Sequence, residues 1–241
     1  MDRISQGASS AVINGETVLA IVPARGGSKR LPRKNVLHLH GKPLIVWTIE
    51  AGLKSKYIDK VVVSSEDSEV LEIARNSNAE TIERPIALAS DDVSSFDVVE
   101  HALNSIQTGV DILVLLQPTS PLRTEMHIDQ ALSLMMNRKA NAIVSVSAAE
   151  HPPLWSNTLP DDDNMESFLN NSVANARSQD LPNFFRVNGA IYICRTKFLL
   201  AEKSFFLKTN ILAYRMSRDT SIDIDHAIDL KLAGLIKNQC P

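Results

Sequence analysis

Short apolar segments alternate with segments of helical periodicity along most of this chain. The clearest apolar segments are VLAIV (18–22), KVVVS (60–64) and DILVLL (111–116), and proline or polar residues follow each of them. Runs of this length with such boundaries are typical of buried strands. A strand–helix–strand order implies right-handed crossovers and a mostly parallel sheet with helices on both faces. The sequence therefore predicts a three-layer α/β domain.

The remaining expected elements complete this Rossmann-like pattern. A helix is expected to begin at Ser94, because Asp97 stands three residues later in the manner of a capping box. We expect further helices at 43–54, 65–76, 124–136 and 227–237, and further strands ending at 82 and spanning 142–147, 189–194 and 211–216. Together these elements predict one α/β domain that runs from residue 17 to residue 241.

Two segments depart from the pattern. Residues 1–16 have no continuous apolar core, so they do not resemble a signal peptide, and we expect a disordered leader there. Residues 150–183 contain several prolines and three consecutive acids at 161–163. A structureless loop of this length is unusual unless it is functional. We therefore expect 150–183 to be an excursion from the domain, in the form of a hairpin.

Charge and composition argue against several classes of partner. The net charge of -3 over 241 residues gives no reason to expect nucleic acid or an anionic membrane as a partner. No apolar run approaches the ~20 residues that a membrane helix needs. Cys194 and Cys240 are far apart and match no metal or redox spacing. The cytoplasm, with reduced thiols, is the expected location.

The stretch RGGSKRLPRKN (25–35) concentrates positive charge directly after the first expected strand. It contains five cationic side chains, two adjacent glycines and no acid. Ligands of parallel α/β sheets bind at the carboxyl ends of the strands, where glycines let backbone N–H groups approach a phosphate closely. Neither a Walker A motif nor a G-x-G-x-x-G fingerprint is present. The pattern favours a polyphosphate site over the alternative of a solvated basic loop.

Five motifs of this chain resemble those of one known family. IVPARGGSKRLPRKN resembles the N-terminal signature of the CMP-sialic acid synthetases, the cytidylyltransferases that activate nine-carbon keto sugar acids. RPIALASDD, LLQPTSPLR, NGAIYI and SIDIDHAIDL resemble later motifs of that family and stand in the same order. The resemblance covers roughly Val18 to Ile236. Related enzymes for the eight-carbon acid KDO usually lack the GGSK form of the loop, which favours the nine-carbon branch.

The resemblance implies a reaction. The anomeric hydroxyl of a sugar acid, N-acetylneuraminate or a relative such as legionaminate, attacks the α-phosphate of CTP, and pyrophosphate leaves. The resemblance further implies a homodimer and Mg²⁺ as cofactor. Catalysis would depend on positioning and electrostatics, which suits a loop of cations and N–H donors. Two alternatives stay open: a cytidylyltransferase for another acid such as pseudaminate or KDO, and a non-catalytic nucleotide-binding protein.

The resemblance also implies the site residues. Those for catalysis and CTP binding are Arg25, Lys29, Lys34, Asp223 and Asp225 together with Ala24, Gly26, Gly27, Ser28, Asn35 and Arg84, of which Asn35 and Arg84 would recognise cytosine. Those for sugar binding are Gln117, Asn188, Tyr192, Phe205, Phe206 and Arg177. The residue types alone leave other readings open: Arg84 as a surface cation before Pro85, Gln117 as a satisfied loop amide, and Phe205 and Phe206 as core residues.

Asp223 and Asp225 are the candidate metal ligands. In a strand, their spacing of two would place both carboxylates on one side. Two carboxylates with phosphate oxygens and water are what Mg²⁺ takes at nucleotide sites. The alternative is that Asp225 caps the helix that follows it. The resemblance favours the metal, and Asp229, one helical turn later, is expected to be solvated.

Two positions depart from the family pattern. Sialic-acid-activating members often carry a lysine shortly after the His-Pro segment and an arginine directly before the Gln of R-Q-x-L-P. Trp155 and Ser178 stand at those positions here, and Arg177 is one place too early. In the family these basic residues reach across a dimer, so residues 150–183 are expected to form the dimer arm. Either Arg177 substitutes through a local shift, or the acceptor is not N-acetylneuraminate, and legionaminate or a related nonulosonate is then the better candidate.

Overall fold

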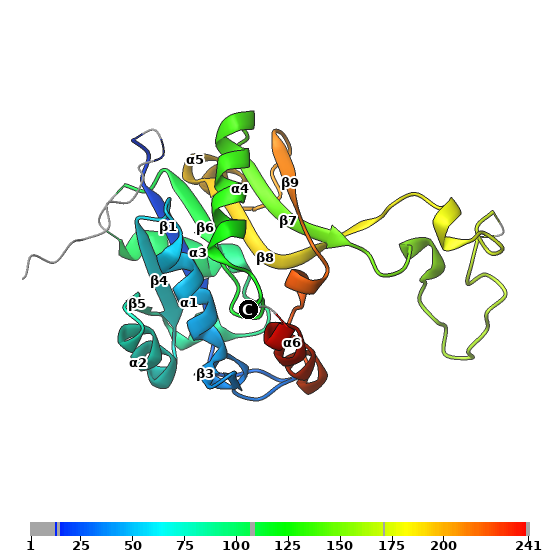
Figure 1. Cartoon of the computed structure of the whole chain (residues 1–241), viewed down its shortest axis with the longest axis horizontal. Helices are drawn as coiled ribbons and strands as arrows, with labels where there is room; N and C mark the ends of the chain where they lie inside the picture. The colour runs from blue at the N-terminus through cyan, green and yellow to red at the C-terminus, as the bar shows by residue number, and fades with distance from the viewer. Residues whose placement is uncertain (1–12, 14, 107–108, 171, 240–241) are drawn as a thin grey trace, which may run out of the picture.

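A computed structural model describes the chain at residue 13 and residues 15–106, 109–170 and 172–239. Within these residues a seven-stranded sheet has the order β5-β4-β1-β6-β8-β7-β9 (Figure 1). Neighbouring strands are parallel except where β8 pairs antiparallel with β6 and β7. The predicted mostly parallel α/β fold is therefore confirmed.

The strands and helices lie close to their expected positions. The strands of the large sheet are β1 (Val18–Pro23), β4 (Lys60–Ser65), β5 (Glu80–Glu83), β6 (Ile112–Leu115), β7 (Ala142–Ala148), β8 (Phe185–Arg195) and β9 (Ile211–Met216), and β2 (His38–Leu39) pairs with β3 (Lys42–Pro43). The helices are α1 (Leu44–Lys54), α2 (Ser68–Asn76), α3 (Ser95–Ser105), α4 (Glu125–Arg138), α5 (Thr196–Glu202) and α6 (Ala227–Gln239).

Helix boundaries follow from local capping. The capping box predicted at Ser94 is present: the Asp97 carboxylate accepts a hydrogen bond from the Ser94 N–H at 3.0 Å, and the Ser94 hydroxyl accepts one from the Asp97 N–H at 3.2 Å. Helix α2 begins at Ser68 rather than at the expected Ser65, because Asp67 accepts a hydrogen bond from the Val70 N–H at 3.1 Å and caps the helix there.

The core lies on both faces of the sheet. In β1, Val18, Ala20 and Val22 belong to one buried cluster, which includes side chains of α1 and α4. The intervening Leu19 and Ile21 belong to a second cluster with side chains of α3 and α5. This alternation is the period of two that a strand requires, and it produces the three layers. Helices α1 and α4 cover the face turned to the viewer in Figure 1.

The segment 150–183, hereafter the arm, projects away from the body of the molecule (Figure 1). The expectation of a hairpin within it is wrong, because its described residues form turns and two short 3-10 helices, η3 (Pro153–Trp155) and η4 (Ser178–Asp180), and no strand. Strand pairing stops at its base, where Ala148 of β7 is the register partner of Phe185 of β8. Few apolar groups in the arm are covered, so nothing favours a regular ladder there.

The expected disordered leader, 1–16, falls mostly on residues 1–12 and 14, which lie outside the described residues. Within the same segment, Ile13 is buried and bridges to Glu16, whose carboxylate pairs with Arg195. Ile13 and Glu16 therefore contact the domain. Cys194 is a free, buried cysteine, and burial raises the pKa of its thiol to about 12. Cys240 lies outside the described residues. No described helix has the length and apolar character of a membrane span.

Candidate active site

A cavity of about 380 Å³ opens at the carboxyl ends of the parallel strands. The loop 25–35 after β1, hereafter the basic loop, forms one wall, and the residue after β5, Arg84, forms another. Residues 88–95 and the turn 117–119 beyond β6 close the sides. Asp223 and Asp225, which precede α6, complete the lining. Loops that are far apart in the chain therefore meet where α/β sheets bind their ligands.

Most of the residues predicted to bind CTP meet at this cavity. Those that line it are Arg25, Ser28, Lys34, Asn35, Arg84, Asp223 and Asp225. Gln117, which was predicted to bind the sugar, lines the same cavity. Gly27 and Lys29 line an adjoining cavity of about 490 Å³ with residues 89–92. Ala24 is buried, and its N–H donates to the carbonyl of Ser64 at 3.0 Å, which fixes the start of the basic loop. Their roles in binding stay predictions.

The two glycines of the basic loop are not equivalent. A Cβ at Gly26 would lie 2.7 Å from Cγ of Asp67, closer than carbon atoms approach without displacement. Asp67 cannot readily move away, because Arg33 and the Val70 N–H hold its carboxylate. A Cβ at Gly27 would meet nothing within 4 Å. Tight packing therefore requires glycine at position 26, whereas position 27 leaves room for a ligand.

Acids from distant segments face each cation of the basic loop. Asp91 pairs with Arg25 at 2.6 Å and also with Lys29. Asp225 pairs with Arg30 at 2.6 Å and with Lys34 at 2.9 Å. The fifth cation, Arg33, pairs with Asp67 and Glu69. The cations of the basic loop are therefore paired with acids, although the side chains of Lys29 and Arg30 are still 84% and 64% exposed. The preference for a polyphosphate site over a solvated loop stays a prediction.

The pKa values of two of these acids reflect the pairing. Hydrogen bonds from Lys29 and Arg25 hold the pKa of Asp91 below its usual value. The Arg33 guanidinium lowers the pKa of Asp67 in the same way, against the effect of burial. Asp91 and Asp67 were not singled out from the sequence. Asp91 lies within the quoted motif RPIALASDD, but nothing in that motif shows which cation it meets.

Arg84 is not the surface cation that its position before Pro85 allows. Its side chain is 3% exposed, and it donates to Oε2 of Glu66 from Nε at 3.1 Å and from Nη2 at 2.9 Å. Asn35 is also buried, and its Nδ2 donates to the carbonyl of Arg25 at 2.9 Å. Both predicted base-recognition residues are thus held in place by protein groups at the cavity wall. Glu66 was missed in the sequence because no motif marks it.

Asp223 and Asp225 do not lie in a strand, contrary to the expectation. They occupy an irregular segment between η5 (Asp219–Ser221) and α6, which Ile224 anchors in a small apolar cluster with Leu39 and Leu44. Both carboxylates nevertheless reach the cavity. The segment stays extended there because the buried isoleucine fixes its middle residue.

The two aspartates differ in their surroundings. Burial raises the pKa of Asp223, and its Oδ1 is a buried atom with no hydrogen-bond partner in the described structure. Burial is the largest single influence on Asp225 and acts to raise its pKa, but the hydrogen bond from Lys34 and the charges of Lys34 and Arg30 together outweigh burial and lower the pKa. Asp225 does not cap α6 as the alternative proposed. Asp229, which was expected to be solvated, instead accepts hydrogen bonds from the N–H groups of Asp225 at 3.0 Å and His226 at 2.7 Å.

These two carboxylates fit a divalent cation that also binds phosphate. No group of three or more His, Cys, Asp or Glu side chains in the described chain could hold a metal alone. Mg²⁺ at nucleotide sites takes one or two carboxylates and completes its shell with phosphate oxygens and water. The partnerless Oδ1 of Asp223 is the kind of acceptor such an ion would satisfy.

The predicted sugar-binding residues are only partly brought together. The Gln117 side chain lies against Gly189, where a Cβ would be 2.6 Å from Oε1, and Gly189 has φ of +74° at a bulge in β8. Tyr192 packs against Phe205 and Phe206 at ring-centroid distances of 5.7 and 6.2 Å. Phe206 is exposed, whereas Phe205 is a core residue, as its alternative reading proposed.

Of the six predicted sugar-binding residues, Gln117 alone lines the cavity in the described structure, and Asn188 and Arg177 are held elsewhere. Asn188 is buried; its Oδ1 accepts from the Ser145 hydroxyl at 2.6 Å, and its Nδ2 donates to the Ser221 hydroxyl at 2.9 Å. Its amide therefore serves the packing of β8. Arg177 is exposed in the arm, and the cavity lining includes no described residue of the arm.

A buried arginine behind the cavity was also missed. Arg123 is 2% exposed, and its Nη1 donates to the carbonyls of Gln117 at 3.2 Å and Ala190 at 3.1 Å. It joins the ends of β6 and β8 just beyond Leu115 and Tyr192, the last register partners. Burial lowers the pKa of Arg123 to about 9. It belongs to LLQPTSPLR, but a motif does not distinguish a buried arginine from an exposed one.

The fold and the cavity define the class first. A mostly parallel α/β sheet with a basic, glycine-containing loop at its carboxyl edge is the arrangement of a nucleotide-binding protein. A family model described as cytidylyltransferase matches residues 19–239, and the chain belongs to this family.

Relatives of known name agree with this assignment. The chain is 38% identical to an N-acylneuraminate cytidylyltransferase of Escherichia coli over 92% of its own length and 52% of the relative. It is 33% identical to a pseudaminic acid cytidylyltransferase of Campylobacter jejuni, over 90% of this chain and 95% of that one. It is 34% identical to a CMP-N,N'-diacetyllegionaminic acid synthase of Legionella pneumophila, over 89% and 94%. The chain thus spans about half the length of the first relative and nearly all of the other two.

A solved structure shows the same fold. A CMP:2-keto-3-deoxy-manno-octonic acid synthetase complexed with CTP superposes with a TM-score of 0.70 at 19% identity, covering 93% of this chain and 99% of that one. At this identity the likeness supports the α/β architecture.

Proposed function

We propose that this protein transfers CMP from CTP to the anomeric hydroxyl of a nine-carbon keto sugar acid. The hydroxyl oxygen bonds to the α-phosphorus and loses its proton, the bond to the bridging oxygen breaks, and pyrophosphate leaves. The observation that carries this proposal is the cavity itself. It unites the basic loop, Arg84, Gln117 and the pair Asp223 and Asp225 at one edge of the sheet. The printed names of the relatives, each for a nine-carbon acid, support the same chemistry.

The basic loop would bind the triphosphate. Arg25, Ser28 and Lys29 line the two adjoining cavities, and the space beside Gly27 admits an oxygen close to the backbone. Lys34 would lie beside the α-phosphate, where negative charge develops as pyrophosphate leaves. Such fixed cations lower the barrier because they need no reorganisation during the reaction.

Arg84 and Asn35 would recognise cytosine. Cytosine presents O2 and N3 as acceptors, and a guanidinium held at the cavity wall can donate to both. Its amino group would donate to backbone carbonyls nearby. A buried donor set of this kind rejects a base that cannot accept the same hydrogen bonds, because the donors would then stay unpaired.

Asp223 and Asp225 would hold Mg²⁺ together with phosphate oxygens and water. The ion would neutralise charge on the phosphates and help to orient them. Lys34, which pairs with Asp225, would link the metal ligand to the α-phosphate. The assignment follows from the fit of the two carboxylates and the partnerless Oδ1 of Asp223.

The acceptor would lie next to Gln117, Tyr192 and Phe206. Trp155 and Ser178 replace basic residues common in sialic-acid-activating relatives, which favours legionaminate or a similar acid over N-acetylneuraminate. Pseudaminate and KDO are the alternatives. The arm, with Arg177, would complete the site of a second copy in a homodimer, because it projects away from the body (Figure 1) and none of its described residues lines the cavity. The cytoplasm, where Cys194 stays reduced, would be the location.

A pyrophosphate-release assay tests the proposal. The protein is incubated with CTP and Mg²⁺ and, separately, with N-acetylneuraminate, legionaminate, pseudaminate or KDO. We expect release with one nine-carbon acid. Release with KDO alone would move the assignment to the eight-carbon branch. Binding of CTP without release for any acid would refute the catalytic proposal and favour a non-catalytic nucleotide-binding protein.

A further inference from the structure

Glu66 lies between two parts of the cavity wall but does not itself line the cavity in the described structure. It follows β4 directly, and β4 lies between β5 and β1 in the sheet. Arg84 follows β5, and Gly26 lies in the loop after β1. The strand order therefore places Glu66 between the arginine on one side and the glycine on the other.

One carboxylate joins both neighbours. Oε2 accepts from Nε and Nη2 of Arg84 at 3.1 and 2.9 Å, and Oε1 accepts from the Gly26 N–H at 2.8 Å. The side chain of Arg84 is 3% exposed and that of Glu66 is 12% exposed. Hydrogen bonds to an ionised carboxylate in such a setting are about twice as strong as neutral ones. Both oxygens are occupied, so the carboxylate has no freedom to turn toward a ligand.

The pairing fixes the direction of the Arg84 donors. An arginine side chain has many rotamers, and a fork-like bond to a carboxylate removes that freedom before a ligand arrives. Nε and Nη2 of Arg84 donate to Glu66. Nη1 is the guanidinium nitrogen that does not donate to Glu66, and it can donate to a ligand in the cavity. A donor that cannot rotate suits an acceptor at N3 of cytosine and opposes the N–H at N3 of uracil. Selectivity between these bases depends on that rigidity.

We propose that Glu66 is the positioning residue that gives this site its preference for cytosine and ties base recognition to the phosphate-binding backbone at Gly26. The inference rests on the proposed function, in which Arg84 recognises the base. Glu66 acts through Arg84 and Gly26 and touches neither the base nor the phosphates.

Binding measurements with three probes test this role. The affinities of the full chain for CTP, UTP and inorganic tripolyphosphate are measured by calorimetry with Mg²⁺, for the wild type and for Glu66→Gln. The glutamine has one oxygen, and its NH₂ group cannot accept a hydrogen bond. We expect the CTP affinity to fall about tenfold or more, on the scale of one charge-assisted hydrogen bond. The affinities for UTP and tripolyphosphate should fall less than about threefold, so the preference for CTP collapses.

Control variants separate positioning from general damage. Glu69→Gln removes a carboxylate from the same segment, but Glu69 pairs with Arg33 and does not contact Arg84; it should keep the preference for CTP. Glu66→Asp keeps the charge that a buried arginine needs but sets it one methylene back. Glu66→Asp should also lower the preference for CTP over UTP, and it provides the test if Glu66→Gln does not fold. On an Arg84→Met background, Glu66→Gln should leave the ratio of CTP to UTP affinity unchanged.

Several outcomes would overturn the inference. A preference for CTP that survives in Glu66→Gln or Glu66→Asp would show that Glu66 does not set it. An equal loss for all three probes would indicate collapse of the basic loop instead of lost base selection. A wild type that binds CTP no better than UTP would refute the role of Arg84 in the proposed function, and the role of Glu66 with it.

Discussion

The basic loop and the arm are both irregular, polar segments, yet they are held in different ways. In the basic loop, the cations pair with acids from other parts of the chain, such as Asp91, Asp225 and Asp67. In the arm, the contacts are local: Trp155 Nε1 donates to the carbonyl of Val173 at 3.2 Å. The loop is therefore shaped by the body, whereas the arm is shaped by its own short-range turns.

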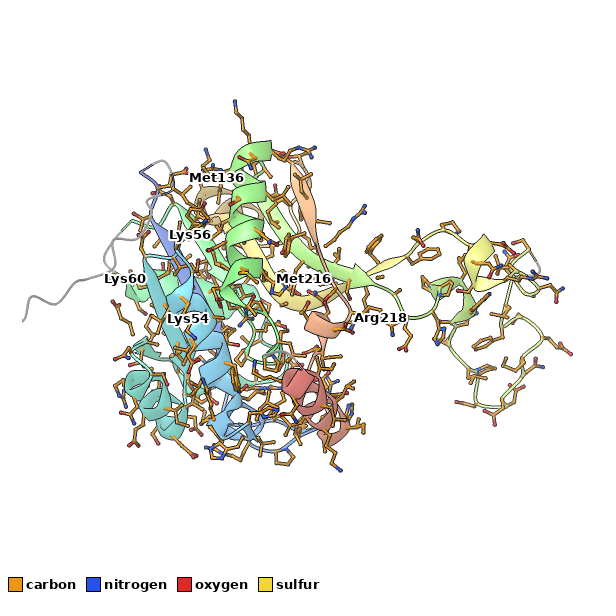
Figure 2. All side chains as sticks on the ribbon, viewed as in Figure 1. Lys54, Lys56, Lys60, Met136, Met216 and Arg218 are labelled. Atoms are coloured by element: carbon orange, nitrogen blue, oxygen red, sulfur yellow. The ribbon has the colours of Figure 1, made fainter. Side chains whose placement is uncertain are left out.

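Exposure follows the same division. Leu154, Leu159 and Met165 of the arm are 40%, 55% and 55% exposed. A contact with the body lies at its base, where Glu150 pairs with Arg218 at 2.9 Å. Arg218 is labelled in Figure 2 on the side of the body from which the arm leaves, and the side chains along the arm point into open space. These exposed apolar side chains are the ones that the proposed dimer contact would cover.

The largest effect is expected from Asp223 at the cavity. Asp223→Asn should lower the rate of pyrophosphate release about 10²–10³-fold, the scale of removing one electrostatic group from an active site. Because burial raises the pKa of Asp223, its ionised form costs stability, and the variant should unfold at the same temperature or higher. Assays of turnover and thermal unfolding check this. Loss of activity together with a lower unfolding temperature would indicate a structural role instead.

The arm should matter less for the fold than for turnover. Residues 152–182 can be replaced by a short glycine–serine turn, since Ala148 and Phe185 are already paired. The body should keep its unfolding temperature, and its affinity for CTP should stay within about threefold of the wild-type value. Turnover should fall about tenfold and the proposed dimer should dissociate, because the deletion removes the interface that would order the site. Sedimentation and CTP titration measure these properties. An unchanged oligomeric state and full turnover would contradict the dimer-arm proposal.

The two glycines of the basic loop offer a matched pair. Gly26→Ala would push against the held carboxylate of Asp67, so we expect about tenfold weaker CTP binding and about 1–2 kcal/mol less stability, as for overpacked sites. Gly27→Ala meets nothing within 4 Å and should leave stability unchanged. Urea unfolding and CTP titration distinguish them. Equal stability losses in both variants would mean that flexibility, not the contact with Asp67, requires glycine.

The smallest effect concerns acid stability at Asp67. The Arg33 hydrogen bond lowers the pKa of Asp67 in the folded state, so this stabilisation is present above the unfolded pKa and is lost as pH falls through the folded value. Asp67→Asn keeps a residue that caps helices well but removes the charge. The substitution should lower the free energy of unfolding by about 0.5–1 kcal/mol at pH 7. This range is small because Arg33 is partly exposed and solvent screens its charge. The cost should shrink as the pH falls below the unfolded pKa and through the lowered folded pKa of Asp67. Urea unfolding at pH 7 and at a series of acidic pH values tests this, and a cost that persists in acid would contradict it.

Much of the fold could be predicted, because its causes are local. The strand at Val18–Val22 was predicted from one short apolar run and the Ser94 capping box from residues three apart, and both are present in the structure. The hairpin expected at 150–183 is absent. The prolines and acids there indicated that the segment leaves the pattern of the domain, but they did not specify which conformation it adopts. The spacing of Asp223 and Asp225 would place both carboxylates on one side of a strand, but spacing alone does not distinguish a strand from the irregular segment that Ile224 anchors.

The sequence indicated which residues belong to the candidate site but not which of them contact one another. The motifs indicated Arg25, Lys34, Arg84 and the two aspartates, and the cavity brings them together. For Asn188, the motif did not show that the hydroxyls of Ser145 and Ser221 already pair with its amide. Its role in sugar binding stays a prediction. Glu66 and Arg123 escaped notice because their importance lies in burial and in the groups they join.

By itself, the sequence determined the α/β fold, the position of a phosphate-type loop after the first strand and the family resemblance. Hydrophobic periodicity and turn chemistry act over a few residues, so the sequence displays them directly. Only the tertiary structure decided which charges meet: Asp91 is 66 residues from Arg25, Asp225 is 191 from Lys34, and Glu66 is 18 from Arg84. Ion pairing depends on distance through space, which strand order and crossovers set, and no local pattern in the chain records that distance.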